Sequence, residues 1–144
     1  MFGIIVGTHG QFAPGIVQSC EMIFGKRDKL KAVTLVPGEG PDDVVAKYEQ
    51  AIAELGTEKI LFFNDLMGGS PYNAACRLVA TNENYGIVAG VNLPALIAIS
   101  ALQDTDDDSL TIAQIMEQAL AAVKDGAVIS SYESLNVATD DDEL

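Results

Sequence analysis

Short apolar runs alternate along the chain with longer segments in which apolar side chains recur every three or four positions. The short runs predict strands and the longer segments predict helices. Ile4-Ile5-Val6 has no polar alternation, which is typical of a strand that helices cover on both faces. The predicted strands are Phe2–Val6, Leu30–Val36, Lys59–Phe63 and Tyr85–Gly90, and the predicted helices are Pro14–Phe24, Pro41–Leu55, Pro71–Ala80, Pro94–Leu102 and Ser109–Lys124.

This alternation predicts a doubly wound α/β fold with a mainly parallel sheet, for which we expect the strand order 2-1-3-4. A last extended segment, Ala127–Ser131, has one apolar pair followed by serines and suits an edge strand better than a central one. The 144 residues are the length of a single globular domain. We therefore divide the chain into one domain, residues 1–131, and an acidic tail, residues 132–144.

The charge of the chain narrows the range of partners. The formal net charge is −13, and Ala101–Leu144 holds eleven of the 21 acidic residues but a single basic one, Lys124. Nucleic-acid binding is not expected, because clustered Lys and Arg hold a phosphate backbone. No apolar run approaches the roughly 18 to 20 residues of a membrane span, and Met1–Val6 lacks the basic region of a secretory signal. We expect a cytoplasmic protein that does not insert into a membrane.

Glycine-rich and polar segments follow three of the predicted strands. They are Gly7–Gly10, Asn64–Pro71 and Val91–Pro94. Ligands of open α/β sheets bind beyond the carboxyl ends of the strands, in the crevice where the strand order reverses. If the first and third strands are neighbours, His9 and Asp65 face each other across that crevice.

His9 is the single histidine of the chain, and the glycines on both sides leave it little cover. An imidazole can attack phosphorus at neutral pH without an external base and can leave again, which suits a reversible phosphoryl carrier. A carboxylate such as Asp65 would fix the tautomer of the ring and stabilise the positive charge that forms. Either residue alone is compatible with an ordinary turn. The two together favour a functional site in which Asp65 orients His9.

The run Gly68-Gly69-Ser70-Pro71 has the composition of a helix start, with Ser70 at the N-cap and Pro71 at the first helical position. The unpaired amide hydrogens of such a start favour an anion, and a phosphoryl group on His9 is a candidate. A capped helix without a ligand is the alternative. No Lys follows the glycines, so this is not a Walker A loop. We expect neither a nucleotide, a metal nor another cofactor.

Four motifs of the chain occur together in one known family. They are FGIIVGTHG at Phe2–Gly10, VPGEG at Val36–Gly40, FFNDLMGGSPYNAA at Phe62–Ala75 and VAGVNLP at Val88–Pro94. In this order and with this spacing, the chain resembles the IIA component of the mannose family of phosphoenolpyruvate-dependent sugar phosphotransferase systems, from its first residues to about Gly126.

The resemblance implies a phosphotransferase that carries a phosphoryl group between two proteins. His9 would accept the group from the histidine-containing phosphocarrier protein HPr and pass it to a IIB component, and the IIC and IID membrane subunits would take part indirectly. Asp65 would orient His9. The residues expected to bind the phosphoryl group are Gly68, Gly69, Ser70 and Thr8.

Two further expectations concern contacts between proteins. Phe12, which lies close to the expected site and has no obvious core partner in its turn, is expected to contact the partner proteins. The resemblance also implies that Ala127–Ser131 runs antiparallel to the other strands and is exchanged between the two protomers of a homodimer.

Three other interpretations use the same histidine. The phosphoryl-carrying subunit of a dihydroxyacetone kinase resembles the same domain, although the full GGSP and GVNLP motifs favour the sugar system. A histidine phosphatase or mutase would need an Arg just before the histidine, where this chain has Thr8, and the chain contains only Arg27 and Arg77. A non-catalytic module that binds partners according to His9 phosphorylation would be inactive in a transfer assay with HPr.

Overall fold

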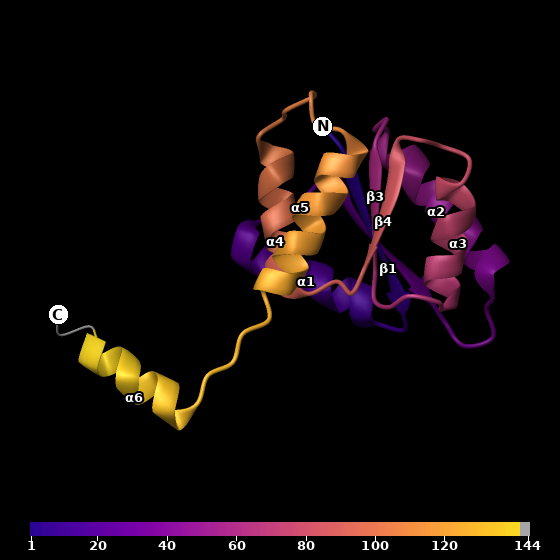
Figure 1. Ribbon diagram of the computed structural model, residues 1–144. Helices are drawn as coiled ribbons and strands as arrows, with labels where there is room; N and C mark the ends of the chain where they lie inside the picture. Colours follow the sequence, from indigo (N-terminus) through magenta and orange to yellow (C-terminus); the bar gives the residue numbers. More distant parts are fainter. Residues whose placement is uncertain (142–144) are drawn as a thin grey trace.

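A four-stranded parallel sheet forms the centre of the molecule in the computed structural model, which describes residues 1–141. The strand order is β2-β1-β3-β4, and every pair is parallel, which confirms the predicted order (Figure 1). The strands are β1 (Gly3–His9), β2 (Leu30–Leu35), β3 (Ile60–Asn64) and β4 (Tyr85–Ala89).

Helices cover both faces of the sheet, as the unbroken apolar runs predict. Helices α1 (Phe12–Phe24), α4 (Leu93–Asp104) and α5 (Ile112–Asp125) pack on one face, and α2 (Pro41–Leu55) and α3 (Ser70–Val79) pack on the other (Figure 1). Successive residues of a strand point to opposite faces. Accordingly Ile4 and Val6 belong to the core under α1, α4 and α5, whereas Ile5 belongs to the core under α2 and α3.

The register of the two central strands decides what lies at the carboxyl edge of the sheet. Gly7 of β1 is paired with Asn64 of β3, so β1 continues to His9 while Asp65 follows directly after β3. The strand order reverses between β1 and β3, where a crevice is expected. His9 and Asp65 therefore reach the same point of the sheet edge.

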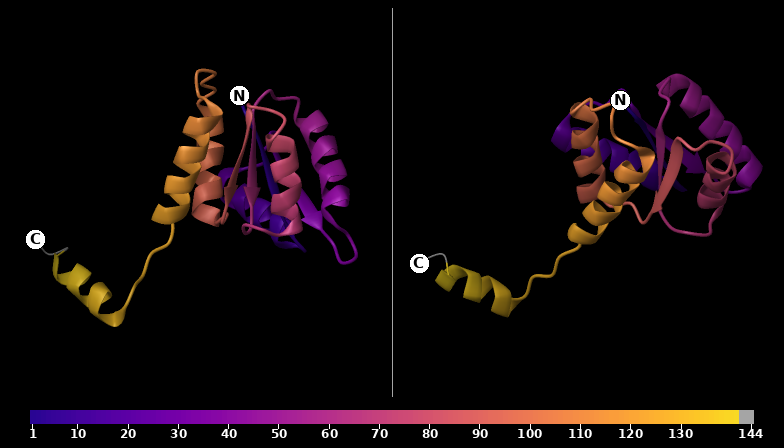
Figure 2. Two further views of the ribbon diagram at one scale, coloured as in Figure 1. Left: turned by 45° about the vertical axis from the view of Figure 1, so that its right-hand side comes forward. Right: turned by 45° about the horizontal axis from the view of Figure 1, so that its top comes forward.

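The edge strand that we expected at the end of the chain is not seen in the described residues of the single chain. Residues 127–131 form no strand in the part of the chain that the structure describes, and α6 (Tyr132–Asp141) follows them where we expected a tail. Both views of Figure 2 show this segment leading away from the sheet. A strand needs a neighbouring strand to exchange backbone hydrogen bonds with, and among residues 1–141 no strand of the sheet pairs with residues 127–131. The expected acidic tail ends in residues 142–144, which lie outside the described residues.

None of the helices in residues 1–141 combines the length and the apolar composition that crossing a membrane requires.

Candidate functional site

His9 is the last residue of β1, and its side chain is 46% exposed. Its Nδ1 lies 2.7 Å from Oδ2 of Asp65, and the same oxygen accepts the backbone N–H of His9 at 3.0 Å. A carboxylate can only accept, so Nδ1 carries a proton, and in the neutral imidazole Nε2 then has the lone pair. The ring is therefore held in one tautomer with Nε2 directed away from Asp65.

Asp65 is fixed in turn by its own neighbours. Its side chain is only 10% exposed, and its second oxygen, Oδ1, accepts the backbone N–H of Leu66 at 3.0 Å. Three N–H groups thus converge on one carboxylate, which is the usual way to hold a negative charge in a sparsely hydrated position. The expected pairing of His9 with Asp65 is present in the structure.

The glycine loop lies against the imidazole. A Cβ atom on Gly69 would come within 2.5 Å of Cε1 and 2.9 Å of Nε2 of His9, so only a glycine allows this approach. Gly68 adopts a φ of +95°, a conformation that favours glycine. The loop therefore reaches the Nε2 side of the ring because two successive residues lack a side chain.

The start of α3 is offset by one residue from the prediction. Gly69 is the N-cap, Ser70 is the first helical residue, and no side chain caps this helix start. In the described residues, the Ser70 hydroxyl and the backbone N–H groups of Gly68, Gly69 and Ser70 have no hydrogen-bond partner. A helix start with free donors attracts an anion. These free donors lie next to the His9 ring, whose Cε1 and Nε2 lie close to Gly69.

Thr8 does not join this group. Its side chain is fully buried, and its hydroxyl accepts the backbone N–H of Ala13 at 2.7 Å and donates to the carbonyl of His9 at 3.1 Å. Side chains alternate along a strand, so Thr8 and His9 point to opposite sides of β1. The hydroxyl of Thr8 connects β1 to the first turn of α1.

Phe12 is the first residue of α1, and its side chain is 47% exposed. It lines an apolar groove with Ile16, Val91 and Leu93. Leu66 and Met67, which follow Asp65, are exposed as well. The surface near His9 is thus partly apolar.

A known protein family matches most of this chain. The sequence profile of the family described as "PTS system fructose IIA component", EIIA-man, matches residues 3–120. The chain belongs to this family, the mannose-type IIA components of the phosphotransferase system. This confirms the resemblance that the four motifs indicated.

Named relatives of this IIA chain differ in length. It is 41% identical over 106 residues to the mannose-specific EIIAB component of Escherichia coli K12, a match that covers 73% of this chain and 32% of that protein. The chain thus spans about a third of the length of that relative. It is 38% identical over 105 residues to the fructose-specific EIIA component of Bacillus subtilis, which is 72% of either chain.

Solved IIA structures share the fold. The EIIA component from Streptococcus agalactiae superposes with a TM-score of 0.79 at 24% identity, over 90% of this chain and 97% of that one. The IIA protein associated with the fucose utilization operon of Streptococcus pneumoniae gives a TM-score of 0.71 at 27% identity, over 93% and 96%.

Sequence reasoning missed two buried polar residues directly beneath the site of this IIA chain. The Nδ2 atom of Asn64 donates to the carbonyl of Gly7 at 2.8 Å and to Oη of Tyr48 at 3.0 Å. The hydroxyl of Tyr48 donates to the carbonyl of Pro71 at 2.9 Å, and burial raises the pKa of this phenol. Asn64 could have been identified from the sequence, because it is a polar residue at the end of an apolar run. Tyr48 could not, because its position in the helical pattern is that of any core residue.

Proposed function

We propose that this chain is a phosphocarrier of a sugar phosphotransferase system, which accepts a phosphoryl group from phosphorylated HPr on His9 and passes it to a IIB component. The observation that carries the proposal is the arrangement of the His9 ring. One nitrogen is held by Asp65 at 2.7 Å, and the other lies against a helix start with free N–H groups. This arrangement provides a nucleophile on one side and anion donors beside it.

In the proposed transfer, the Nε2 lone pair of His9 forms a bond to phosphorus as the bond between phosphorus and the histidine nitrogen of HPr breaks. The electron pair of that bond stays on HPr. No external base is needed, because Nε2 carries no proton. The ring of His9 becomes positively charged, and Asp65 stabilises that charge through the hydrogen bond to Nδ1.

The phosphoryl oxygens would be held by the N–H groups of Gly68, Gly69 and Ser70 and by the Ser70 hydroxyl. These donors are supported as ligands by their lack of other partners among the described residues. Donors that are already oriented stabilise the transferring phosphoryl group without reorganisation. The reverse sequence of bond changes delivers the group to a IIB component.

HPr and IIB must reach the same histidine, one after the other, so each must bind and leave a shared surface. Phe12, with its exposed ring and the apolar groove beside it, is our candidate contact for both. The IIC and IID subunits of such a system would act on the sugar in the membrane, while this chain remains in the cytoplasm. An unchanged apparent affinity for both partners in Phe12→Ala would remove this contact.

We also propose that residues 127–131 pair with β4 of a second copy, antiparallel to it, in a symmetric dimer of the domain formed by residues 1–131. Two observations support this exchange. Val128 and Ile129 are 82% and 98% exposed, and an apolar groove formed by Ile87, Met116 and Leu120 lies along β4, the edge strand. Unpaired edge strands are usually covered.

Light scattering of the full chain and of a chain truncated after Gly126 tests this dimer across a concentration series. The full chain should be dimeric and the truncated chain monomeric. A full-length chain that remains monomeric well above micromolar concentration would refute the exchange. A truncated chain that still dimerises would place the interface on another surface.

The phosphocarrier proposal is tested by incubation with phosphoenolpyruvate, enzyme I and HPr, followed by intact mass measurement. We expect a gain of one phosphoryl group that is labile in acid and stable in base, as a phosphoramidate is. His9→Ala should not be labelled. Label that persists in His9→Ala, or that is recovered on Ser70 or Thr8, would overturn the assignment.

A further inference from the structure

A buried hydrogen-bonded chain lies one layer beneath His9 and the glycine loop. It runs from the carbonyl of Gly7 through the Asn64 amide and the Tyr48 hydroxyl to the carbonyl of Pro71, with distances of 2.8, 3.0 and 2.9 Å. Asn64 and Tyr48 are completely buried. The chain joins β1, β3, α2 and α3; β1 contains His9, α3 begins with Ser70, and β3 ends directly before Asp65.

The direction of each hydrogen bond in this chain is fixed by its two ends. The carbonyls of Gly7 and Pro71 can only accept. Asn64 must therefore direct its NH₂ group toward Gly7, and Tyr48 must direct its single proton toward Pro71. The Tyr48 oxygen is then left to accept from Asn64, so the network has one consistent arrangement and the phenol is neutral.

Each anchor of the network lies within two residues of a residue of the site along the backbone. Asn64 precedes Asp65, Pro71 follows Ser70, and Gly7 lies two residues before His9. A Cβ atom on Gly7 would overlap the Tyr48 hydroxyl, so β1 must approach Tyr48 closely for the network to form. A shift of Tyr48 would move the start of α3 relative to the end of β1.

We propose that Tyr48 and Asn64 are positioning residues that set the distance between the His9 ring and the free N–H groups at the start of α3. This inference rests on the proposed phosphorylation of His9. The Tyr48 hydroxyl donates to the carbonyl of Pro71 and so fixes the start of α3. The Asn64 amide donates to Tyr48 and to the carbonyl of Gly7 and so connects the tyrosine to β1. The reactive nitrogen and the anion donors are thereby kept at a fixed separation before a phosphoryl group arrives.

One detail indicates that Asn64 serves more than stability. Its Oδ1 atom is buried and has no hydrogen-bond partner among the described residues. A buried acceptor without a partner destabilises a protein, and packing an apolar residue there would avoid this cost. The amide is nevertheless well suited to one task, because its NH₂ group donates to Gly7 and to Tyr48 at once.

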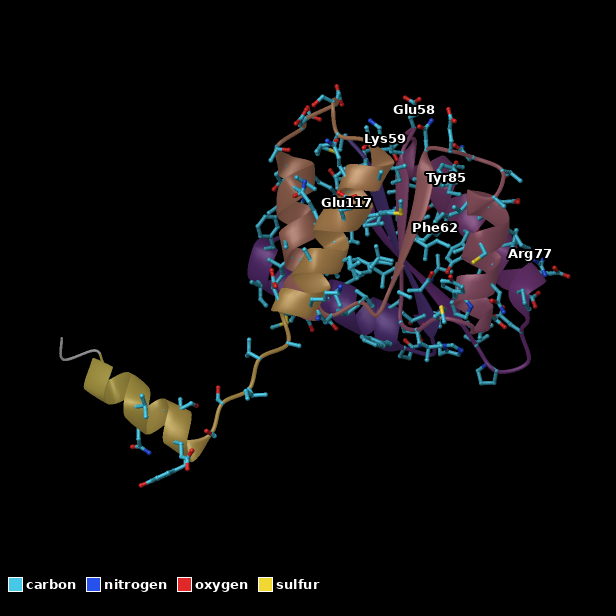
Figure 3. All side chains as sticks on the ribbon, in the orientation of Figure 1. Glu58, Lys59, Phe62, Arg77, Tyr85 and Glu117 are labelled. Atoms are coloured by element: carbon cyan, nitrogen blue, oxygen red, sulfur yellow. The ribbon has the colours of Figure 1, made fainter. Side chains whose placement is uncertain are left out.

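The first test compares Tyr48→Phe with Tyr85→Phe in transfer from phosphorylated HPr. Each substitution removes one hydroxyl, and both rings pack edge-on against Phe62. Tyr85 begins β4 and is paired with Ile60, the first residue of β3, so it lies at the amino end of the sheet, whereas His9 is the last residue of β1. Figure 3 labels Tyr85 together with Phe62. We expect Tyr48→Phe to lower kcat about tenfold, because the donors would no longer be held at the distance that the transition state requires, with KM for HPr unchanged. Tyr85→Phe should transfer like the unaltered chain.

The second test needs no phosphorylation. In ¹H–¹⁵N spectra of the unphosphorylated protein, Tyr48→Phe should shift the Ser70 amide and the ¹⁵N resonance of His9 Nε2, and Tyr85→Phe should shift neither. The same spectra verify that both variants are folded. Asn64→Ala is a second variant that should shift the same two signals.

The outcomes separate this inference from the proposed function. If the unaltered chain accepts no phosphoryl group from HPr, the proposed function fails, and the spectra alone judge the positioning role. If the chain is phosphorylated but Tyr48→Phe retains kcat within twofold, the positioning role is refuted. A change confined to KM, or unchanged Ser70 and His9 signals in Tyr48→Phe, would refute it as well.

Discussion

The two ends of the sheet differ in how their polar groups are hydrogen-bonded. At the carboxyl end, the Ser70 hydroxyl and the N–H groups of the glycine loop are unpaired among the described residues, and His9 is nearly half exposed. At the amino end, the Gln103 amide donates to the carbonyls of Phe2 and Lys29 at 2.8 and 3.0 Å. At the amino end these polar groups are therefore paired with one another. At the carboxyl end the hydrogen-bond donors of the glycine loop are free.

Arg27 completes this pairing at the amino end. Its guanidinium donates to both carboxylate oxygens of Asp104, to the carbonyl of Ser100 and to the side chain of Gln103, and it lies over the ring of Phe24. A satisfied polar cluster holds elements together, whereas free donors can bind a ligand without breaking a hydrogen bond within the protein. Substitutions at the carboxyl end of the sheet should therefore lower the transfer rate. Substitutions at the amino end should lower the stability of the fold.

Asp65→Asn is expected to have the largest effect, and that effect is on the rate of phosphoryl transfer. An amide cannot stabilise a positive imidazole as a carboxylate does, and it can hold the ring in the wrong tautomer. We expect the transfer rate to fall by one to several orders of magnitude, roughly 10- to 10⁴-fold, while the thermal midpoint stays close to that of the unaltered chain. Rapid-quench transfer in both directions and calorimetry measure the two quantities. Unaltered rates in both directions would make Asp65 a turn residue only.

Gly69→Ala should be the next largest effect at the carboxyl end. The added Cβ atom would press on Cε1 and Nε2 of His9, and we expect at least about a tenfold loss in transfer, which corresponds to about 1.4 kcal/mol. Gly40→Ala is the matched control, because Gly40 is also a helix N-cap in an extended conformation and has no atom near its Cβ position. Equal transfer rates in the two alanine variants would contradict the close approach of the loop to the ring.

At the amino end, Gln103→Leu should reduce stability and spare transfer. The leucine keeps most of the buried volume but leaves the carbonyls of Phe2 and Lys29 without this donor. We expect a loss of about 1 to 3 kcal/mol in the free energy of unfolding, measured by urea denaturation. The comparison of the two ends would fail if this variant lost transfer activity while its stability stayed the same.

The smallest effect concerns acid stability. The Arg27 guanidinium, by its hydrogen bonds, holds the pKa of Asp104 below its ordinary value. Because the pKa is depressed in the folded state, this pair stabilises the fold above the ordinary carboxyl pKa and loses its contribution as the pH falls through the lowered value. In Asp104→Asn, the decline of the thermal midpoint in strongly acidic buffer should therefore be slightly shallower. An identical pH profile in the variant would show that the pair contributes nothing measurable.

Sequence reasoning was most successful where a local pattern has one structural meaning. Unbroken apolar runs could be buried only in a sheet covered on both faces, and a histidine and an aspartate that follow such runs had to reach the same edge. The N-cap of α3 was wrong by one residue, because both Gly69 and Ser70 are acceptable at that position. The orientation of the Thr8 hydroxyl toward Ala13 depends on where α1 begins, which the sequence leaves uncertain by a few residues.

The sequence by itself determined the family, the parallel sheet and the pair formed by His9 and Asp65, because periodicity and the four motifs are local properties of the chain. Only the tertiary structure decided that Tyr48, from a helix far along the chain, lies beneath Gly7 and supports the start of α3. Hydrogen bonds between distant segments leave no periodic trace. The path of residues 127–131 was likewise not decided within the chain, because a strand forms only where a neighbouring backbone accepts and donates its hydrogen bonds.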